Sequence, residues 1–300
     1  MPISICLLNY NTYSDTIECI DSLLKQTVDN FDIIVIDNYS TNNSVEMIAN
    51  HFNIKKVLYS AYTHNNSQFN CIKEPTSKAS KIHLISNLEN KGFSAGNNVA
   101  IRYSNTYLHN QELILLNNDT IVDSDFVELM DIEYNRFKSI HKSAIAMGTT
   151  EKTYVTHEIS HTGFHYLNLL SGFVFAKPLF PYFKYICGAC LMIDNHVPSM
   201  DEKYFLYYDD ADFSKSLIKN GYILCTTNKT CYFHKLSSSI PDSTFKAENH
   251  IISMWRFYKK HYGFFVPTVL VIRFFQYSIK NKWAVLKILF RTLKKTQTNV

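Results

Sequence analysis

Short apolar runs alternate with longer amphipathic segments along the first part of the chain. Residues 14–26 carry apolar side chains at helical spacing, and residues 97–107 form a second, less regular helix candidate. The apolar runs are bounded by Asn, Asp or Ser and predict buried strands over residues 3–8, 33–36, 82–85 and 113–116. Strands that alternate with helices are typical of a mostly parallel α/β sheet flanked by helices, and we predict this fold class.

Length and composition favour one large domain with an appendage. The chain has 300 residues, of which 46% are hydrophobic and 19% charged, so it can bury a sizeable core and is neither disordered nor fibrous. Residues 60–81 are polar and aperiodic, which predicts an inserted loop. We expect a sheet domain over residues 1–245, interrupted by this loop, and a helical C-terminal segment over residues 246–300.

The C-terminal segment differs in charge from the rest of the chain. Residues 249–300 hold ten Lys or Arg and no Asp or Glu, whereas the chain before them holds twenty basic and twenty-six acidic residues. Over residues 274–293, an apolar stripe lies beside basic side chains, which predicts a basic amphipathic helix on a membrane surface. Packing on its own domain, or on a second copy in a homodimer, is the alternative. No nucleic-acid reading module accompanies the charge, so nucleic acid is not an expected partner.

Three features bear on the compartment. The seven cysteines are odd in number and widely spread, which favours reduced thiols over a disulfide framework. The N-terminal apolar run ends at Asn9 with no basic residue before it, so no export signal is expected. The apolar run over residues 264–272 is shorter than the ~20 residues that span a bilayer. We expect a cytoplasmic protein, peripheral at the inner face of the membrane.

Polar residues follow each predicted strand. In parallel sheets, ligands bind beyond the carboxyl ends of the strands, where such residues meet. One polar cluster alone indicates no more than a turn or a helix cap, but four at one sheet edge favour a polar ligand site. The clusters hold Asn9 and Asn11 after the first strand, Asp37 and Asn38 after the second, residues 87–98 after the third and residues 117–119 after the fourth.

The second and third clusters have features of a nucleotide site. Asp37 can accept hydrogen bonds from a ribose hydroxyl or a base N–H, or it can cap the following helix. Lys91, Gly92, Gly96 and Asn97 stand where a helix begins, and the glycines there allow a phosphate to approach the backbone. A plain loop-to-helix turn is the alternative.

Carboxylates at two further places suggest metal and base chemistry. Asp119 follows the fourth strand, where Mg²⁺ or Mn²⁺ can bridge it to a diphosphate, or where it caps a turn. Asp209, Asp210 and Asp212 follow an aromatic run, and like charges so close together raise the pKa of one carboxyl group, which suits a general base. The alternative is an acidic first turn before a helix over residues 214–220.

Taken in order, these blocks resemble family 2 glycosyltransferases of the GT-A fold, nearest to the rhamnosyltransferase-like group. The resemblance covers residues 3–240, and its specificity lies in the order and spacing of the blocks rather than in any one of them. The blocks are residues 8–11, 35–40, 90–98, 116–120, 187–189, 201–212 and 234–237.

The resemblance implies an inverting glycosyltransferase. Such an enzyme moves a sugar from a nucleoside diphosphate sugar, here a UDP- or dTDP-sugar, to a hydroxyl of a cell-surface glycan or lipid-linked acceptor. The resemblance makes Asp210 the catalytic base and assigns a divalent cation to Asp119 and His234. It places Gly188, Asp209 and Asp212 on the acceptor side. Donor contacts are implied for Asn9, Asn11, Asp37, Asn38, Lys91, Gly92, Gly96, Asn97, Asn117 and Asn118.

Two other function classes stay open at this point. A sugar nucleotidyltransferase needs a Gly-rich, Arg-containing loop after the first strand, and residues 9–11 offer none. A noncatalytic, membrane-associated nucleotide-sugar-binding protein would keep the sheet and bind the donor without turnover.

Two zinc-like motifs compete with this interpretation. Residues 157–161 satisfy H-E-x-x-H, with His165 close behind, but the preceding β-branched residues and Gly163 favour a strand or turn over the helix of a zinc protease. Cys187 and Cys190 form one C-x-x-C without a second, so buried thiols are favoured over a zinc site.

Overall fold

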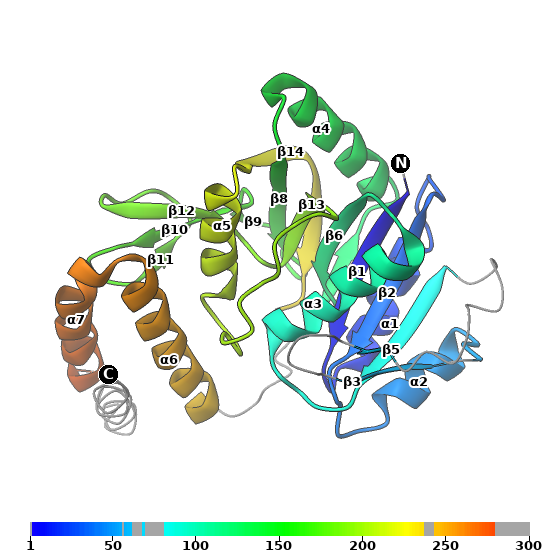
Figure 1. Ribbon diagram of the computed structural model, residues 1–300, viewed down its shortest axis with the longest axis horizontal. Helices are drawn as coiled ribbons and strands as arrows, with labels where there is room; N and C mark the ends of the chain where they lie inside the picture. The colour runs from blue at the N-terminus through cyan, green and yellow to red at the C-terminus, as the bar shows by residue number, and fades with distance from the viewer. Residues whose placement is uncertain (1, 56, 62–67, 70–80, 237–242, 280–300) are drawn as a thin grey trace.

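We analysed the fold in a computed structural model of the chain (Figure 1). It describes residues 2–55, 57–61, 68–69, 81–236 and 243–279. Most of the predicted amphipathic stripe, from residue 280 onward, and the last residue of the 234–237 block lie outside the described residues, and so does most of the predicted inserted loop.

The four predicted strands are confirmed as the parallel centre of the large sheet. They are β1 (Ile3–Asn9), β2 (Phe31–Asp37), β5 (Ile82–Asn87) and β6 (Glu112–Asn117). Strand β1 pairs with β2 on one side, with Asn9 opposite Asp37, and with β6 on the other, with Leu8 opposite Asn117. The polar residues that end these strands therefore meet at one sheet edge.

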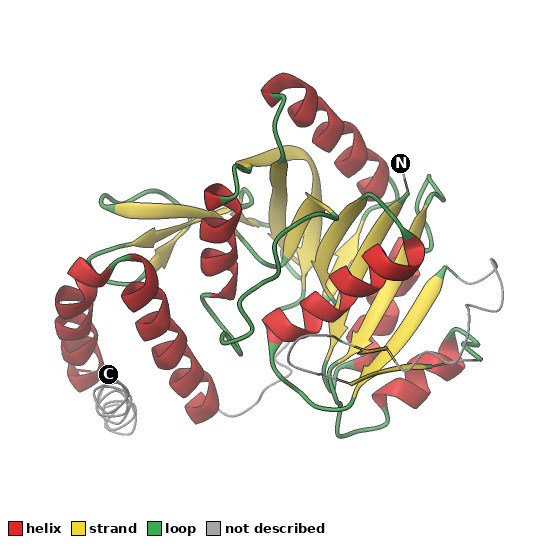
Figure 2. Cartoon of the chain, viewed as in Figure 1, coloured by secondary structure: helices red, strands yellow, loops and turns green. Residues whose placement is uncertain are grey.

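Helices cover both faces of this sheet (Figure 2), which confirms the predicted α/β class. On one face, α1 (Tyr13–Leu23), α2 (Ser44–His51) and α4 (Phe126–His141) share a core with Ile33 and Val35. On the other, α3 (Phe93–Tyr103) and α5 (Asp209–Lys219) share a core with Ile34 and Ile36. Successive β2 residues thus serve opposite cores, as the alternation of side chains along a strand requires.

Two helix boundaries differ from the sequence prediction. Helix α3 begins at Phe93 rather than at residue 97 and continues into a π-helical turn, η1 (Ser104–Leu108). Helix α5 begins at Asp209, so all three clustered aspartates lie in its first turn. In both cases the helix begins directly after a residue of positive φ, Gly92 and Tyr208.

The second half of the chain extends the sheet and brings His234 back to the centre. The further strands are β7 (Thr120–Val122), β8 (Ile145–Thr153), β9 (Ile159–His161), β13 (Cys190–Asp194) and β14 (Ile223–His234). Strand β13 runs antiparallel to β6 and β8, and β14 pairs with both β8 and β7. Because His234 pairs with Thr120, the end of β14 lies beside Asp119.

The predicted loop over residues 60–81 is partly wrong. Strand β3 (Leu58–Ala61) runs parallel to β5, and β4 (Gln68–Phe69) pairs with β3 at the edge of the large sheet. The polar composition hid these short edge strands, since a strand at the border of a sheet needs little apolar patterning.

The C-terminal helices pack on a small second sheet. This sheet consists of β11 (Val174–Phe175), β10 (Phe164–Asn168) and β12 (Tyr182–Ile186). Helix α6 (Ser243–His261), the short turn η2 (Gly263–Phe265) and helix α7 (Val266–Ile279) follow at the C-terminal end of the described chain. Phe257 of α6 and Val269 of α7 share a third core with Phe183 and with Ala211 of α5. The boundary predicted at residue 245 therefore does not separate two hydrophobic cores.

Candidate active site

A pocket of about 420 Å³ opens at the carboxyl ends of β1, β2 and β6. The position is the one that a parallel α/β sheet offers to a ligand. Six residues predicted for the site line this pocket: Asn38, Gly92, Asn117, Asn118, Asp119 and His234.

Asp37 organises the floor of this region from a buried position. Its Oδ1 accepts hydrogen bonds from Asn9 Nδ2 at 2.7 Å and from Ser40 Oγ at 2.6 Å, and its Oδ2 accepts one from the Ser40 amide at 3.0 Å. Asn11, at a positive φ of 59°, donates its backbone N–H to Ser40 Oγ. The three hydrogen bonds to Asp37 fill most of the acceptor positions of its carboxylate, and Asp37, which is buried, does not itself line the pocket.

Gly92 forms part of another wall of the pocket. Its φ is 91°, and a Cβ there would lie 2.4 Å from the carbonyl oxygen of Phe205. Asn38 Nδ2 donates to the Gly92 carbonyl at 3.1 Å, and the Gly92 amide donates to Asn90 Oδ1 at 2.9 Å. Only glycine allows the backbone of the 201–212 segment to approach this closely.

Of the predicted phosphate-binding residues Lys91, Gly92, Gly96 and Asn97, only Gly92 lines the pocket, and phosphate binding there stays a prediction. The Phe93 amide, the first of α3, donates to the Phe205 carbonyl at 2.8 Å and does not point into open space. Gly96 faces β1, where a Cβ would lie 2.4 Å from a Leu8 methyl group, and buried Asn97 donates back to the Phe93 carbonyl. Lys91 forms an ion pair with Glu89 at 2.7 Å. Gly96 and Asn97 therefore serve helix packing, because a helix this close to a strand needs a small residue at the contact.

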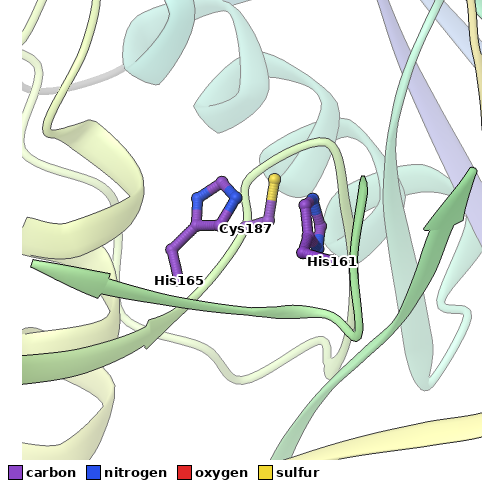
Figure 3. A group of neighbouring side chains, drawn as sticks. All are labelled: His161, His165 and Cys187. Atoms are coloured by element: carbon purple, nitrogen blue, oxygen red, sulfur yellow. The ribbon is translucent and has the colours of Figure 1, made fainter. Parts of the chain in front are cut away.

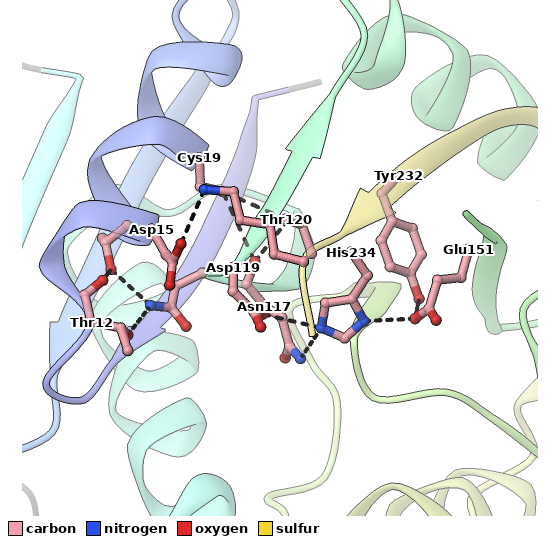
Figure 4. Close-up of polar contacts among 12 residues, drawn as sticks. Thr12, Asp15, Cys19, Asn117, Asp119, Thr120, Glu151, Tyr232 and His234 are labelled. Carbon is pink, nitrogen blue, oxygen red and sulfur yellow. Dashed lines mark hydrogen bonds and ion pairs between the residues drawn. The ribbon is translucent and has the colours of Figure 1, made fainter. Parts of the chain in front are cut away.

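Asp119 and His234 meet in the pocket, although 115 positions separate them in sequence (Figure 4). His234 Nε2 lies 3.1 Å from Asp119 Oδ1, and Nδ1, on the other side of the ring, lies 2.8 Å from Glu151 Oε2. Burial by itself lowers the pKa of His234, but the hydrogen bonds with Asp119 and Glu151 outweigh burial and raise that pKa to about 9. Tyr232 donates its hydroxyl to the same Glu151 oxygen at 3.0 Å.

This donor set fits a divalent cation. A carboxylate oxygen and an imidazole nitrogen face the same pocket, with Asn117 Nδ2 3.5 Å from His234 Nε2. Oxygen donors with an imidazole suit Mn²⁺ and Mg²⁺. A metal-binding histidine usually gives its second ring nitrogen to a carboxylate, and Glu151 occupies that place.

Asn118 ties the same loop to α1. Its Nδ2 donates to Thr12 Oγ1 at 2.9 Å and to Thr16 Oγ1 at 2.8 Å, and Thr16 in turn donates to Asn9 Oδ1. The ends of β1 and β6 are thereby held in one network.

Asp210, at the start of α5, is not among the residues that line the pocket. Its Oδ2 accepts from the Gly188 amide at 3.3 Å and its Oδ1 from the Ala211 amide at 2.8 Å. The neighbouring Ala189 carbonyl accepts the Asn117 amide at 2.9 Å, so the 187–189 loop connects Asp210 to the pocket wall. Burial raises the pKa of Asp210 to about 6 despite these amides, and burial together with the charge of Asp210 raises that of Asp209 to about 8.

Asp212, predicted for the acceptor side, does not line the pocket and contacts α6 instead. Its carboxylate accepts from Lys260 at 2.9 Å and from the Tyr204 hydroxyl at 3.1 Å, and it pairs with His261 at 2.7 Å. Since residues three apart on a helix lie on one face and residues two apart do not, Asp210 and Asp212 point to different sides of α5. Asp212 anchors α6 to α5.

The H-E-x-x-H motif does not form a helix, which agrees with the prediction of a strand or turn. His157 sits in an exposed turn at φ 59°, with its ring against Phe233, while His161 ends β9. The two histidines therefore do not share the helical face of a zinc protease.

Several residues of the site have no sequence signal that identifies them. Glu151 is a single acidic residue inside a strand, and Lys246 belongs to α6, beyond the predicted domain boundary, yet lines the pocket. Phe205, Leu206 and Tyr207 also line the pocket, and the sequence gave them only as part of the 201–212 block, without a role.

The family of the chain follows from a match to known sequences. The model of Glycosyl transferase family 2 matches residues 4–196, more than half of the chain. The protein therefore belongs to glycosyl transferase family 2. The rhamnosyltransferase-like subgroup stays a prediction.

Individual relatives agree with this family. The chain is 28% identical over 137 residues to the low-salt glycan biosynthesis hexosyltransferase Agl10 of Haloferax volcanii. The alignment covers 44% of this chain and 45% of that protein. The aligned part is thus less than half of that relative.

Solved structures share the fold at low sequence identity. The crystal structure of GalNAc-T7 with UDP, GalNAc and Mn²⁺ matches with a TM-score of 0.59 and 14% identity, over 86% of this chain and 49% of that one. TarS 1–349 of S. aureus, in complex with UDP-GlcNAc, matches with a TM-score of 0.56 and 14% identity, over 98% and 80%. These similarities confirm the predicted GT-A type of α/β sheet.

Proposed function

We propose that the protein is an inverting glycosyltransferase that moves a sugar from a nucleoside diphosphate sugar to an acceptor hydroxyl. The observation that carries this proposal is the meeting of Asp119 and His234 in a strand-end pocket, to which the 187–189 loop connects Asp210. Family membership supports the same reaction class.

The donor fits the pocket as follows. Asp37 stays the predicted nucleoside contact, and Asp119 with His234 would hold Mg²⁺ or Mn²⁺ beside the diphosphate. When bound, the cation neutralises charge on the leaving diphosphate. Lys246 is the one lysine among the described residues that line the pocket, and a bound cation would add positive charge beside the diphosphate.

Asp210 supplies the base. Its ionised carboxylate takes the proton of the acceptor hydroxyl while that oxygen forms a bond to the anomeric carbon, and the bond from this carbon to the diphosphate oxygen breaks. Attack on the side opposite the leaving group inverts the anomeric configuration. The Gly188 and Ala211 amides orient the carboxylate.

Solved structures of similar proteins hold uridine or guanosine nucleotides or nucleotide sugars, so they support a nucleotide-sugar donor without selecting its base. The GalNAc-T7 and TarS structures contain UDP and UDP-GlcNAc. A UDP-sugar is the donor to test first, with a dTDP-sugar second.

The acceptor is a glycan or lipid-linked sugar at a membrane surface. Within the described part of the chain, no helix is both long and apolar enough to cross a bilayer. Phe264 is 90% exposed and Phe275 59% exposed, and Val271 and Phe274 are exposed beside them, so η2 and α7 present apolar side chains to the outside. Such a face, followed in sequence by a basic segment, suits anionic lipid, with a homodimer partner as the alternative.

Vesicle flotation separates these two occupants. We expect the wild-type protein to float with anionic vesicles and to float less with neutral vesicles. The double variant Phe264→Ser, Phe275→Ser should remain in the vesicle-free fraction. Val155→Ser, at an 88% exposed position on a distant turn, is the control. If the protein does not bind vesicles but forms a dimer through this face, the membrane proposal is wrong.

Donor binding tests the function itself. Thermal unfolding with nucleoside diphosphates and their sugars should give the largest rise in Tm for one diphosphate sugar with Mn²⁺, since a ligand of the native state stabilises by RT ln(1 + [L]/Kd). If no nucleotide sugar in the panel binds, is hydrolysed or is transferred, the proposal is wrong.

A further inference from the structure

Neither zinc-like motif of the sequence holds as written, but side chains from both meet in space. His161 at the end of β9, His165 in β10 and Cys187 after β12 point toward one another (Figure 3), with one ligand atom of each within 4.8 Å of the other two. The His161 and His165 rings are 4.4 Å apart at 72°. We infer that these three side chains form a zinc site, distinct from the proposed donor metal at Asp119 and His234.

The donor chemistry selects zinc. With Cys187 deprotonated on metal binding, one thiolate and two imidazoles would form a borderline-soft ligand set that suits Zn²⁺ and does not suit Mg²⁺. Three protein ligands would leave one tetrahedral position open for water.

A carboxylate that could orient a metal-bound His161 lies beside its ring. His161 Nε2 is buried 3.3 Å from Glu151 Oε2. The Nδ1 atom accepts the Gly163 amide at 3.0 Å. Coordination through Nδ1 would displace that amide and leave Nε2–H to turn toward Glu151, the arrangement in which a carboxylate orients a metal-bound histidine.

The site would brace the loop that holds the proposed base. The Cys187 amide donates to the Gly163 carbonyl at 3.0 Å, and the next amide, of Gly188, donates to Asp210 Oδ2. Zinc on Cys187 would therefore fix the β9–β10 turn against this loop. This consequence rests on the proposed role of Asp210, whereas zinc binding does not.

Metal content and Co²⁺ spectra test the inference without any activity. The full-length chain is grown with zinc, purified in excess Mg²⁺ and assayed by mass spectrometry for metals, and we expect about one zinc per chain. After exchange, Co²⁺ should give a thiolate charge-transfer band. Both signals should persist in Cys190→Ser, whose thiol lies three residues on and outside the group, and in Asp119→Asn.

Cys187→Ser should lose the band and most of the zinc. If that variant does not fold, His165→Asn replaces a ligand at a partly exposed position and should lower the zinc affinity. Competition with a chelator of known zinc affinity measures the decrease. A wild-type protein with little zinc and no thiolate band would overturn the site. So would a Cys187→Ser protein that binds Co²⁺ and Zn²⁺ as the wild type does. Zinc binding in a protein without transferase activity would leave the site standing and reject only the proposed function.

Discussion

Nδ1 of His234 lies 2.8 Å from Oε2 of Glu151, on the opposite side of the ring from Asp119. Strands β14 and β8 hold this pair, because their pairing sets Tyr232 opposite Glu151 and brings His234 two positions further along the same strand. The carboxylate thereby fixes the orientation of the imidazole whose Nε2 faces the pocket.

Replacement of Glu151 by Gln should weaken metal binding. The amide removes the negative charge behind His234, and loss of such a supporting carboxylate typically costs ~10–100-fold in metal affinity. Titration with Mn²⁺, followed by electron paramagnetic resonance with nucleoside diphosphate present, measures the change. Glu158→Gln, on an exposed turn, is the control. A folded Glu151→Gln protein with wild-type Mn²⁺ affinity would show that this contact does not support the metal.

Gly92→Ala should destabilise the fold and impair donor binding together. The added Cβ meets the Phe205 carbonyl at 2.4 Å, and alanine is strained at a φ of 91°, so we expect a loss of about 2–4 kcal/mol. Urea unfolding measures it. Gly263→Ala has open space around the new methyl group and should change stability by less than about 1 kcal/mol. Equal effects at the two glycines would refute the close approach of the 201–212 segment.

Asp212→Asn should loosen α6 from α5. Burial raises the pKa of Asp212, but hydrogen bonds from His261 and Lys260 outweigh burial and hold it below its usual value. The stabilisation is therefore complete above the ordinary carboxyl pKa of about 4 and is lost as the pH falls below it. At pH 7 we expect a loss of about 2–4 kcal/mol, with little difference from wild type under acid conditions.

Thermal unfolding at both pH values checks this prediction. The control is Asp201→Asn, which removes a more exposed contact with the same Lys260 and should cost less than about 1 kcal/mol. An Asp212→Asn deficit that is the same in acid as at pH 7 would show that the charge of Asp212 does not stabilise the fold.

Turnover should rise with pH through about 6. Burial raises the pKa of Asp210 to about 6, and a base must be ionised to accept a proton, so the rate falls on the acid side of that value. Burial and the charge of Asp210 also raise the pKa of Asp209, its neighbour in this buried pair. A profile of kcat against pH tests this, and Asp209→Asn should keep the limb near 6. A limb near the ordinary carboxyl value of about 4 would argue against a buried base.

The parts of the fold that are predictable from the sequence are those with local pattern. Apolar runs such as 33–36 identify strands because both faces of a parallel sheet are buried, and strand ends identify the site edge. The start of α3 was predicted four residues late, because Gly92 is set by its approach to Phe205, a partner 113 positions away. Short edge strands such as β4 carry too few residues for any pattern.

Site residues were predictable where they belong to one of the sequence blocks, and not where they reach the site from other parts of the chain. Asp119 and His234 each stand in such a block and do meet. Glu151 and Lys246 reach the site through strand pairing and helix packing, which leave no local mark. Gly96 was misread because a glycine that admits a phosphate and one that admits a neighbouring strand look the same in sequence.

Turnover of Asp210→Asn, measured beside Asp209→Asn and wild type at saturating donor and Mn²⁺, tests the central claim most directly. We predict that Asp210→Asn loses about 10²–10⁴-fold in kcat while donor affinity by calorimetry stays within about 2-fold, and that Asp209→Asn keeps measurable turnover. If Asp210→Asn transfers sugar at a rate near that of the wild type, Asp210 is not the base and the proposed mechanism is wrong.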